Sequence, residues 1–286
     1  MNAWNRWDLH PSVLIGLAVL GGLYVYLGVL TSAPFASLRA RRRLASFCGA
    51  IAVLFLALNG PLHNLSDSYL FSAHMVQHLV LTLVFPPLLL YGTPAHVVRP
   101  LLRPKWVMAA ARVATRPLAA GVIFSVPITI WHAPALYEAA LRNHNLHILQ
   151  HLVFLATGTL MWWPVLSPVP ELPRAQHLLQ MVYLFLLGIP MSVTGALITF
   201  SDSALYPFYV TAPRVGGLSP LDDQQIGGLL MWVLGGLMLW IVMTVIWFRY
   251  SVWDERTDAE TEVPVEAYEN AELGMRNAEL QGGRRT

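Results

Sequence analysis

Two short stretches of the sequence carry histidines at the spacing of metal ligands on a helix. His74 and His78 are four residues apart, and His144, His147 and His151 follow one another at intervals of three and four. Residues three or four apart share one face of a helix, about 5–6 Å from each other. Neutral imidazole is a ligand for copper, zinc, iron and nickel. The two stretches therefore predict a metal site built from imidazole.

The sulfur-containing residues narrow the choice of metal. The chain has one cysteine, Cys48, and ten methionines. A single cysteine excludes a disulfide framework, a paired-cysteine redox motif and a thiolate metal site. Met75 lies beside the first histidine pair, and thioether sulfur favours Cu(I), so copper is the expected metal. The candidate ligands are His74, His78, His147 and His151, with His132, His144 and Met75 as additional candidates.

The elements that position these side chains are expected to be membrane helices. Hydrophobic residues make up 56% of the 286 residues and charged residues 12%, against about 25% charged in a soluble domain. A helix needs about 20 apolar residues to cross a membrane. We predict an all-α, polytopic membrane protein with seven transmembrane helices, of which the fourth is interrupted by Pro127. The apolar runs cover roughly 13–31, 44–62, 69–91, 118–131, 147–166, 177–200 and 226–248.

The distribution of basic residues predicts the orientation in the membrane. Fifteen of the 18 Lys and Arg residues lie in 32–43, 92–117, 167–176 and the segment from 249 onward. Cytoplasmic loops carry the excess of such residues, so we expect the N-terminus outside and the C-terminus in the cytoplasm. The basic cluster at 39–43 follows the first apolar run, which is the reverse of a signal peptide. A retained first helix is expected.

This orientation sorts the histidines unevenly. Only His96 and His177 lie on the predicted cytoplasmic side, and the other eight lie in outer loops or outer halves of helices. Ionisable side chains inside a membrane are costly, and they are functional candidates by default. Single histidines near helix ends commonly form interfacial hydrogen bonds, and we assign His10, His63, His96 and His177 to that class. Two pairs at matched depth favour a metal site, although a metal-free structural role stays open.

The composition changes near the C-terminus. Residues 251–286 contain nine Asp or Glu against four Arg and have no apolar pattern that could form a core. Such composition is typical of disordered segments. We therefore predict two parts, a transmembrane domain over 1–250 and an acidic, disordered cytoplasmic tail over 251–286.

Four stretches, in this order, resemble one protein family. They are FSAHMVQH at 71–78, WHAPALYEAAL at 131–141, the His147/His151 pair leading to Trp162-Trp163-Pro164, and DDQQIGG at 222–228. The chain is similar over about 11–248 to the CtaG family, the assembly factors of caa(3)-type cytochrome c oxidase. A similarly named copper chaperone has one membrane anchor and cysteine ligands, and this chain has neither.

The resemblance implies a multi-pass protein of the bacterial plasma membrane that matures a haem–copper oxidase without turnover of its own. It implies copper binding or delivery at the extracytoplasmic side, where the copper-bearing oxidase subunits would be the partners. Besides those subunits and the lipid bilayer, a homo-oligomer stays open, and no nucleic acid is expected.

Other uses of membrane histidines compete with this interpretation. A di-iron oxygenase would have adjacent histidines facing the cytoplasm, and a bis-histidine haem protein would space them 13–14 residues apart along a helix, given the ~1.5 Å rise. Neither pattern fits, but a membrane metal-dependent or haem redox enzyme and a metal-free assembly scaffold remain the alternatives. Retinal binding is excluded because the single lysine, Lys105, lies in a predicted cytoplasmic loop.

Overall fold

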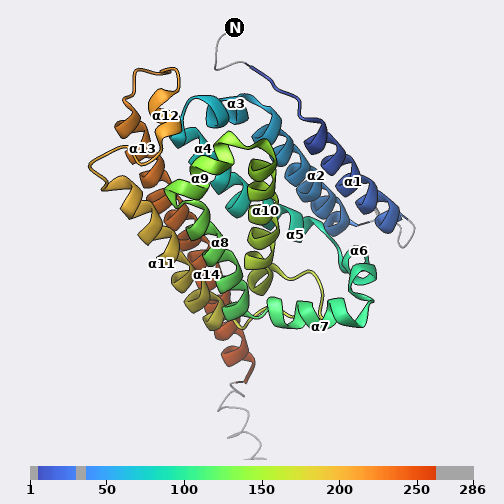
Figure 1. The fold of residues 1–286 in the computed structure, drawn as a ribbon. Helices are drawn as coiled ribbons and strands as arrows, with labels where there is room; N and C mark the ends of the chain where they lie inside the picture. The colour runs from blue at the N-terminus through green and yellow to red at the C-terminus, as the bar shows by residue number, and fades with distance from the viewer. Residues whose placement is uncertain (1–5, 30–36, 262–286) are drawn as a thin grey trace, which may run out of the picture. The chain divides into compact units, whose positions relative to one another are not determined.

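The structure is a computed structural model that describes residues 6–29 and 37–261. Within these residues all regular secondary structure is helical (Figure 1). The chain divides into two units, 1–241 and 242–286, and the candidate ligands all lie in the first. The principal helices are α1 (Pro11–Val29), α2 (Leu38–Asn59), α3 (Pro61–Ser68), α4 (Phe71–Leu79), α5 (Phe85–Gly92), α6 (Ala95–Val98), α7 (Lys105–Ala114), α8 (Pro117–Trp131), α9 (Pro134–Arg142), α10 (His144–Leu166), α11 (His177–Thr199), α12 (Pro207–Thr211), α13 (Pro220–Leu229) and α14 (Gly235–Thr261).

Six helical segments of the described chain are long and apolar enough to cross a membrane. The chain is therefore a multi-pass membrane protein. They span Pro11–Gly28, Leu38–Asn59, Phe71–Gly92, His144–Leu166, His177–Thr199 and Pro220–Ser251. A seventh arises only if α7 and α8 count as one bent pair, so the structure does not establish the predicted seven.

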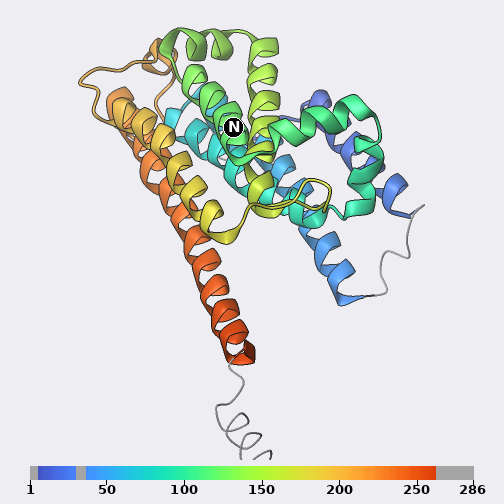
Figure 2. The same cartoon turned by 90° about the horizontal axis from the view of Figure 1, so that it is seen from below.

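The fourth predicted span, α8, is the one that differs from expectation. Its 15 residues reach only about 22 Å, and it is bent by 81° from α7. The bend follows from Pro117, which disfavours helical geometry at Arg116 and starts a new helix at its own position. Figures 1 and 2 show α7 turning away from α8. Pro127, in contrast, lies inside α8 without ending it.

The span that begins with α4 contains a π-helical turn, Val80–Val84, directly after His78. Pro86, in the first turn of α5, has no N–H to offer to the carbonyl of Thr82. The indole N–H of Trp162, on α10, donates to that carbonyl at 2.9 Å. This bond satisfies a freed backbone group inside the membrane, as such breaks require, and it joins the α4–α5 span to α10.

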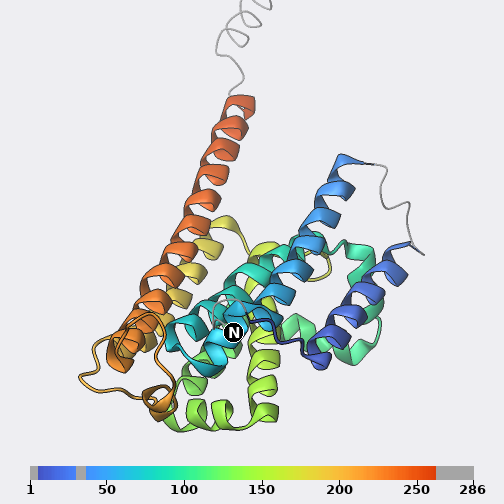
Figure 3. The ribbon, with the colours of Figure 1, turned by 90° about the horizontal axis from the view of Figure 1, so that it is seen from above.

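The packing places α4 and α10 in the interior of the first unit. α4 contacts α3 and α13, while α10 contacts α5, α8 and the π-helical turn. Figure 3 shows α1 and α2 on one side of these helices and α13 on the other. Figure 1 shows α3, α9 and α12 at the end of the bundle where α4 and α10 begin. The two histidine-bearing helices are therefore covered by short helices at that end.

The last helix runs past the predicted end of the transmembrane domain. α14 continues to Thr261, so residues 251–261 of the segment expected to be a disordered tail are helical. Residues 262–286 of that segment lie outside the described residues.

Candidate metal centre

The eight histidines assigned to the outer side form one continuous group. Neighbouring rings in this group have centroids 4.3 to 6.4 Å apart. Exposure falls along the series, because His144 is exposed and His10 half-buried, whereas the other six are less than 9% exposed. We call this group the histidine cluster. Its members are His10, His63, His74, His78, His132, His144, His147 and His151.

The four principal candidate ligands lie together inside the cluster. The ligand nitrogens of His74, His147 and His151 are all within 4.8 Å of one another. His78 Nε2 is 2.8 Å from His74 Nε2. Two imidazole nitrogens bound to one ion at about 2.0–2.1 Å can be at most about 4 Å apart. A small inward movement of the rings would therefore bring these nitrogens onto one ion.

The hydrogen bonds of His74 fix its tautomer. The hydroxyl of Tyr209, on α12, donates to the carbonyl of Ser66 at 2.7 Å. That hydroxyl has no second proton, so its oxygen accepts the N–H from His74 Nδ1 at 2.9 Å. The neutral ring then carries its lone pair on Nε2. In this state His74 Nε2 accepts the N–H of His78 Nε2.

Two further imidazoles have the same tautomer as His74. His147 Nδ1 lies 3.3 Å from the carboxylate of Asp67, and His132 Nδ1 donates to the carbonyl of Ile128. Both acceptors hold the proton on Nδ1 and leave the lone pair on Nε2. An acceptor behind each ring is the arrangement found around metal-binding histidines.

Four buried ring nitrogens of the cluster have no hydrogen-bond partner among the described residues. They are Nε2 of His132, His147 and His151, and Nδ1 of His78. Buried polar atoms are almost always paired in native structures, so several such atoms in one place require a physical reason. A bound cation that accepts their lone pairs would supply that reason. The donor set therefore fits a metal ion with a preference for nitrogen.

Asp67 is held by two histidines at the outer edge of this site. The amide N–H groups of Gln77 donate to the Ala57 carbonyl at 2.7 Å and to His63 Nδ1 at 2.9 Å. His63 therefore carries its proton on Nε2, which lies 3.4 Å from Asp67. Burial opposes ionisation of Asp67, but the hydrogen bond and charge of His147 and the charge of His63 hold the pKa of its carboxyl well below the usual range. Asp67 is therefore a carboxylate at neutral pH.

The start of α4 is anchored by α13. The carboxylate of Asp223, which is fully buried, accepts the backbone N–H groups of Phe71 and Ser72 at 2.7 and 3.1 Å. A carboxylate at a helix N-terminus satisfies unpaired N–H groups and the helix dipole. This contact gives Asp223, within the 222–228 stretch, a structural role. It also fixes the start of the helix that carries His74 and His78.

The additional candidates differ in position. His132 joins the buried part of the cluster, with its ring centroid 5.5 Å from that of His78. His144 lies at its exposed end, 6.1 Å from His10. Met75 packs toward α13, where a side chain on Gly227 would lie 3.2 Å from Met75 Cγ.

Sequence reasoning missed two groups, Asp67 and Tyr209. Asp67 could have been found, because it follows His63 by four residues and so shares its helix face. Tyr209 could not, since it lies 135 residues from the histidine that it contacts. His10 and His63, assigned to interfacial hydrogen bonding, belong to the cluster.

Comparison with known proteins gives one family. Residues 16–251 match the family described as cytochrome c oxidase caa3 assembly factor (Caa3_CtaG). Two relatives, described as uncharacterized proteins of Mycobacterium bovis and Mycobacterium tuberculosis, are each 27% identical to this chain. Each alignment covers 98% of this chain and 48% of the relative. An uncharacterized protein of Mycobacterium leprae is 23% identical to this chain, in an alignment that covers 92% of this chain and 43% of the relative. The chain thus spans about half the length of these relatives. No solved structure matches it.

Proposed function

We propose that this chain, which belongs to the cytochrome c oxidase caa3 assembly factor family, binds a copper ion in the histidine cluster and delivers it for oxidase maturation. The observation that carries the proposal is the shared tautomer of His74, His132 and His147. Each ring donates its Nδ1 proton to a fixed acceptor, so that Nε2 carries the lone pair that a cation would accept. Rings that served only to hold helices together would not leave buried nitrogens unpaired.

The charge of the site favours Cu(I). Neutral imidazoles add no charge, and Asp67 supplies one negative charge beside His147. A monovalent cation would therefore enter a buried site with its charge balanced. A divalent cation would leave a net charge in the low-dielectric interior, which is costly.

His74, His147 and His151 are the three ligands of the proposed site, and His78 is the fourth. A cation on His74 Nε2 displaces the N–H of His78 from that atom. The His78 proton then moves to Nδ1, which is unpaired in this structure, and Nε2 gains a lone pair for the ion.

The exposed end of the cluster is the proposed route for copper. His144 and His10 lead inward to His63 and His147. On the basic-residue count this end faces outward from a bacterial plasma membrane. The copper-bearing subunits of the oxidase on that side are the proposed recipients.

Metal analysis of the purified protein tests the copper site. We expect about one copper per chain, lost in a His74→Ala/His78→Ala variant together with oxidase maturation. A His96→Ala/His177→Ala variant is the matched control, because it removes two imidazoles outside the cluster, and it should retain copper. Unchanged copper in the first variant would assign the cluster a purely structural role.

Reporter fusions test the orientation. A reporter joined after Asp67 should be active only outside the cytoplasm, and one joined after Ser251 only inside it. Activity of both on the same side would contradict the seven-span topology and the outward-facing cluster.

A further inference from the structure

One side of α7 carries apolar residues that point away from the bundle. Trp106 is 76% exposed and Val113 is 58% exposed, and Ala109 and Ala110 between them are exposed as well. Residues three, four and seven apart share one side of a helix. These four residues therefore form a stripe about 10 Å long, at 1.5 Å per residue. We call this stripe the outer face of α7.

The opposite side of α7 packs against the bundle. Val107, Met108 and Ala111 lie against buried residues of the neighbouring connections, such as Leu102 and Leu172. A second apolar side is therefore not needed to hold α7 in place. Contiguous apolar residues on a protein surface commonly mark a contact with another protein or with a membrane. The outer face of α7 thus indicates a contact outside the described residues.

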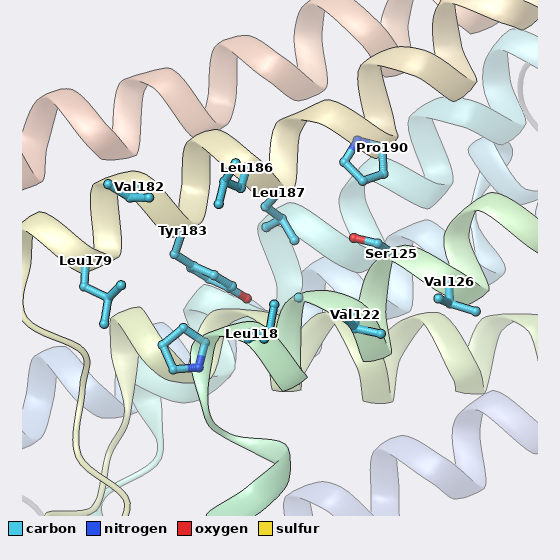
Figure 4. A pocket seen from close by; sticks show the side chains of 12 residues that line it. Leu118, Val122, Ser125, Val126, Leu179, Val182, Tyr183, Leu186, Leu187 and Pro190 are labelled. Carbon is cyan, nitrogen blue, oxygen red and sulfur yellow. The ribbon is translucent and has the colours of Figure 1, made fainter.

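A groove beside the start of α8 shows how far the hydrocarbon region reaches. It lies between α8 and α11, and apolar side chains such as Leu118, Val122 and Leu186 line it (Figure 4). All three are more than half exposed, and α11 is long and apolar enough to cross a membrane. Acyl chains are the apolar surroundings that such side chains meet in a bilayer. The hydrocarbon region therefore reaches the first turn of α8, where Leu118 lies.

The helix α7 runs along this boundary. Only Thr115 and Arg116 separate its end from the start of α8, and the two helices are bent by 81° from each other. Figure 1 shows α7 running crosswise to α8 and α10, at the end of the bundle opposite α9 and α12. A helix nearly perpendicular to membrane-crossing neighbours lies nearly in the membrane plane. Tryptophan, such as Trp106, is enriched at the membrane–water interface.

A third side of α7 is basic. Lys105 and Arg112 are seven residues apart, about two helical turns, so they share a side that lies between the outer face and the packed side. Both are exposed. Arg103 precedes the helix and Arg116 follows it, and residues 103–116 contain no Asp or Glu. The segment therefore carries four positive charges and no negative one.

Other parts of the described chain do not balance these charges. None of the four basic side chains forms an ion pair among the described residues. Glu171 lines one cavity with Arg112 and Arg116, but it is paired with Arg99 at 2.7 Å. Basic residues at a membrane surface attract anionic lipids. The charge of the segment therefore matches an anionic bilayer surface.

We propose that α7 lies in the membrane–water interface and binds anionic phospholipids. Its outer face enters the acyl-chain boundary, and Lys105 and Arg112 contact the phosphate groups of the surrounding lipids. A helix with tryptophan and other apolar residues on one side and Lys and Arg on another is typical of this position. The proposal does not depend on copper, because α7 precedes the start of α8 and the histidine cluster lies at its end.

Spin labels on the full chain test the position of α7. In a Cys48→Ala background, which removes the single cysteine, Trp106→Cys and Val113→Cys carry a label on the outer face. Lys105→Cys and Arg112→Cys carry one on the basic side. In nanodiscs that contain phosphatidylglycerol, the outer-face labels should be relaxed mainly by oxygen, which concentrates in acyl chains. The basic-side labels should be relaxed mainly by a water-soluble nickel complex.

Two further labels calibrate this measurement. Leu118→Cys lies in the groove and should favour oxygen, and Asp202→Cys lies in an exposed loop and should favour nickel. Outer-face labels that favour nickel as strongly as Asp202→Cys would overturn the proposal, because the face would then be open to a partner in water.

Lipid selectivity tests the basic side. Binding of phosphatidylglycerol and of phosphatidylcholine to the detergent-purified full chain is compared by native mass spectrometry. Each basic residue near a membrane surface contributes about fivefold in affinity, equivalent to about 1 kcal/mol, so Lys105→Gln/Arg112→Gln should weaken phosphatidylglycerol binding about 25-fold. Lys105→Arg/Arg112→Lys keeps both charges and should stay within about twofold of wild type. Equal phosphatidylglycerol binding by the glutamine variant and wild type would overturn the proposal.

Discussion

The two ends of α8 carry opposite polar chemistry. His132 follows its last residue and belongs to a buried group of neutral rings, whereas Arg116 precedes its first residue and lines an exposed pocket of permanent charges. The ends are about 22 Å apart along the helix. A permanent charge buried inside a membrane protein is costly, but a neutral imidazole becomes part of a charged site only when a cation binds. Burial therefore explains why histidine is used at one end and arginine at the other.

This contrast has a consequence for mutations. At the histidine cluster the position of a single proton decides whether a ring can bind a cation, so substitutions that preserve shape should still impair it. At the start of α8, in contrast, an arginine is charged whatever its surroundings, so no proton position decides its state. The following variants test the behaviour of the histidine cluster.

The largest effect should come from the second histidine pair. Losing an outer-shell partner of a metal ligand weakens binding about 10–100-fold, and losing two ligands should exceed this range. A His147→Ala/His151→Ala variant should therefore lose more than about 100-fold in Cu(I) affinity, as measured by competition with a chromogenic chelator. Removing His74 and His78 as well should add no further loss if one site is shared. A fall from two copper ions to one would instead show two separate sites.

Asp67→Asn should have the next largest effect. Asparagine keeps the shape and an acceptor for His147, but it removes the charge that balances a cation. Cu(I) affinity should fall about 10–100-fold, and the same titration should give the wild-type value for Arg112→Gln/Arg116→Gln. An Asp67→Asn protein with wild-type affinity would show that this carboxylate does not balance the ion.

Tyr209→Phe should have a smaller effect, about tenfold at the low end of the same range. Phenylalanine removes the acceptor for His74 Nδ1–H, and the proton is then free to occupy Nε2 and block the ligand atom. The measurement is again Cu(I) competition. Because Tyr209 also bonds the Ser66 carbonyl, a thermal unfolding curve serves as the control for lost stability. Unchanged affinity would mean that the tautomer is set by other groups.

The smallest effect on copper should come from helix packing. A Cβ on Gly228 would lie 2.4 Å from Thr199 Oγ1 and 2.8 Å from the carbonyl oxygen of Gly195, whereas one on Gly236 meets nothing within 4 Å. Gly228→Ala should therefore cost about 1–3 kcal/mol of stability through overpacking, and Gly236→Ala should cost much less. Neither should change Cu(I) affinity once the protein is folded. A loss of affinity in Gly228→Ala alone would show that α13 controls the cluster through Asp223.

Parts of this arrangement could be predicted from the sequence for physical reasons. Helical periodicity places His74 beside His78 and His147 beside His151, whereas the side of the membrane that the basic-residue count assigns to them stays a prediction. The acceptors behind the rings could not be predicted in the same way. Asp67 and Tyr209 reach the site from short helices whose docking depends on tertiary packing. The 81° bend before α8 depends on Pro117, whereas the sequence alone predicts a loop there, followed by an interrupted span.

X-ray absorption spectroscopy of the copper-loaded protein tests the central claim most directly. We predict one copper per chain with three or four nitrogen neighbours at about 2 Å and the outer-shell scattering of imidazole rings. Sulfur neighbours at about 2.3 Å, or a protein that takes up no copper, would contradict the proposed imidazole site.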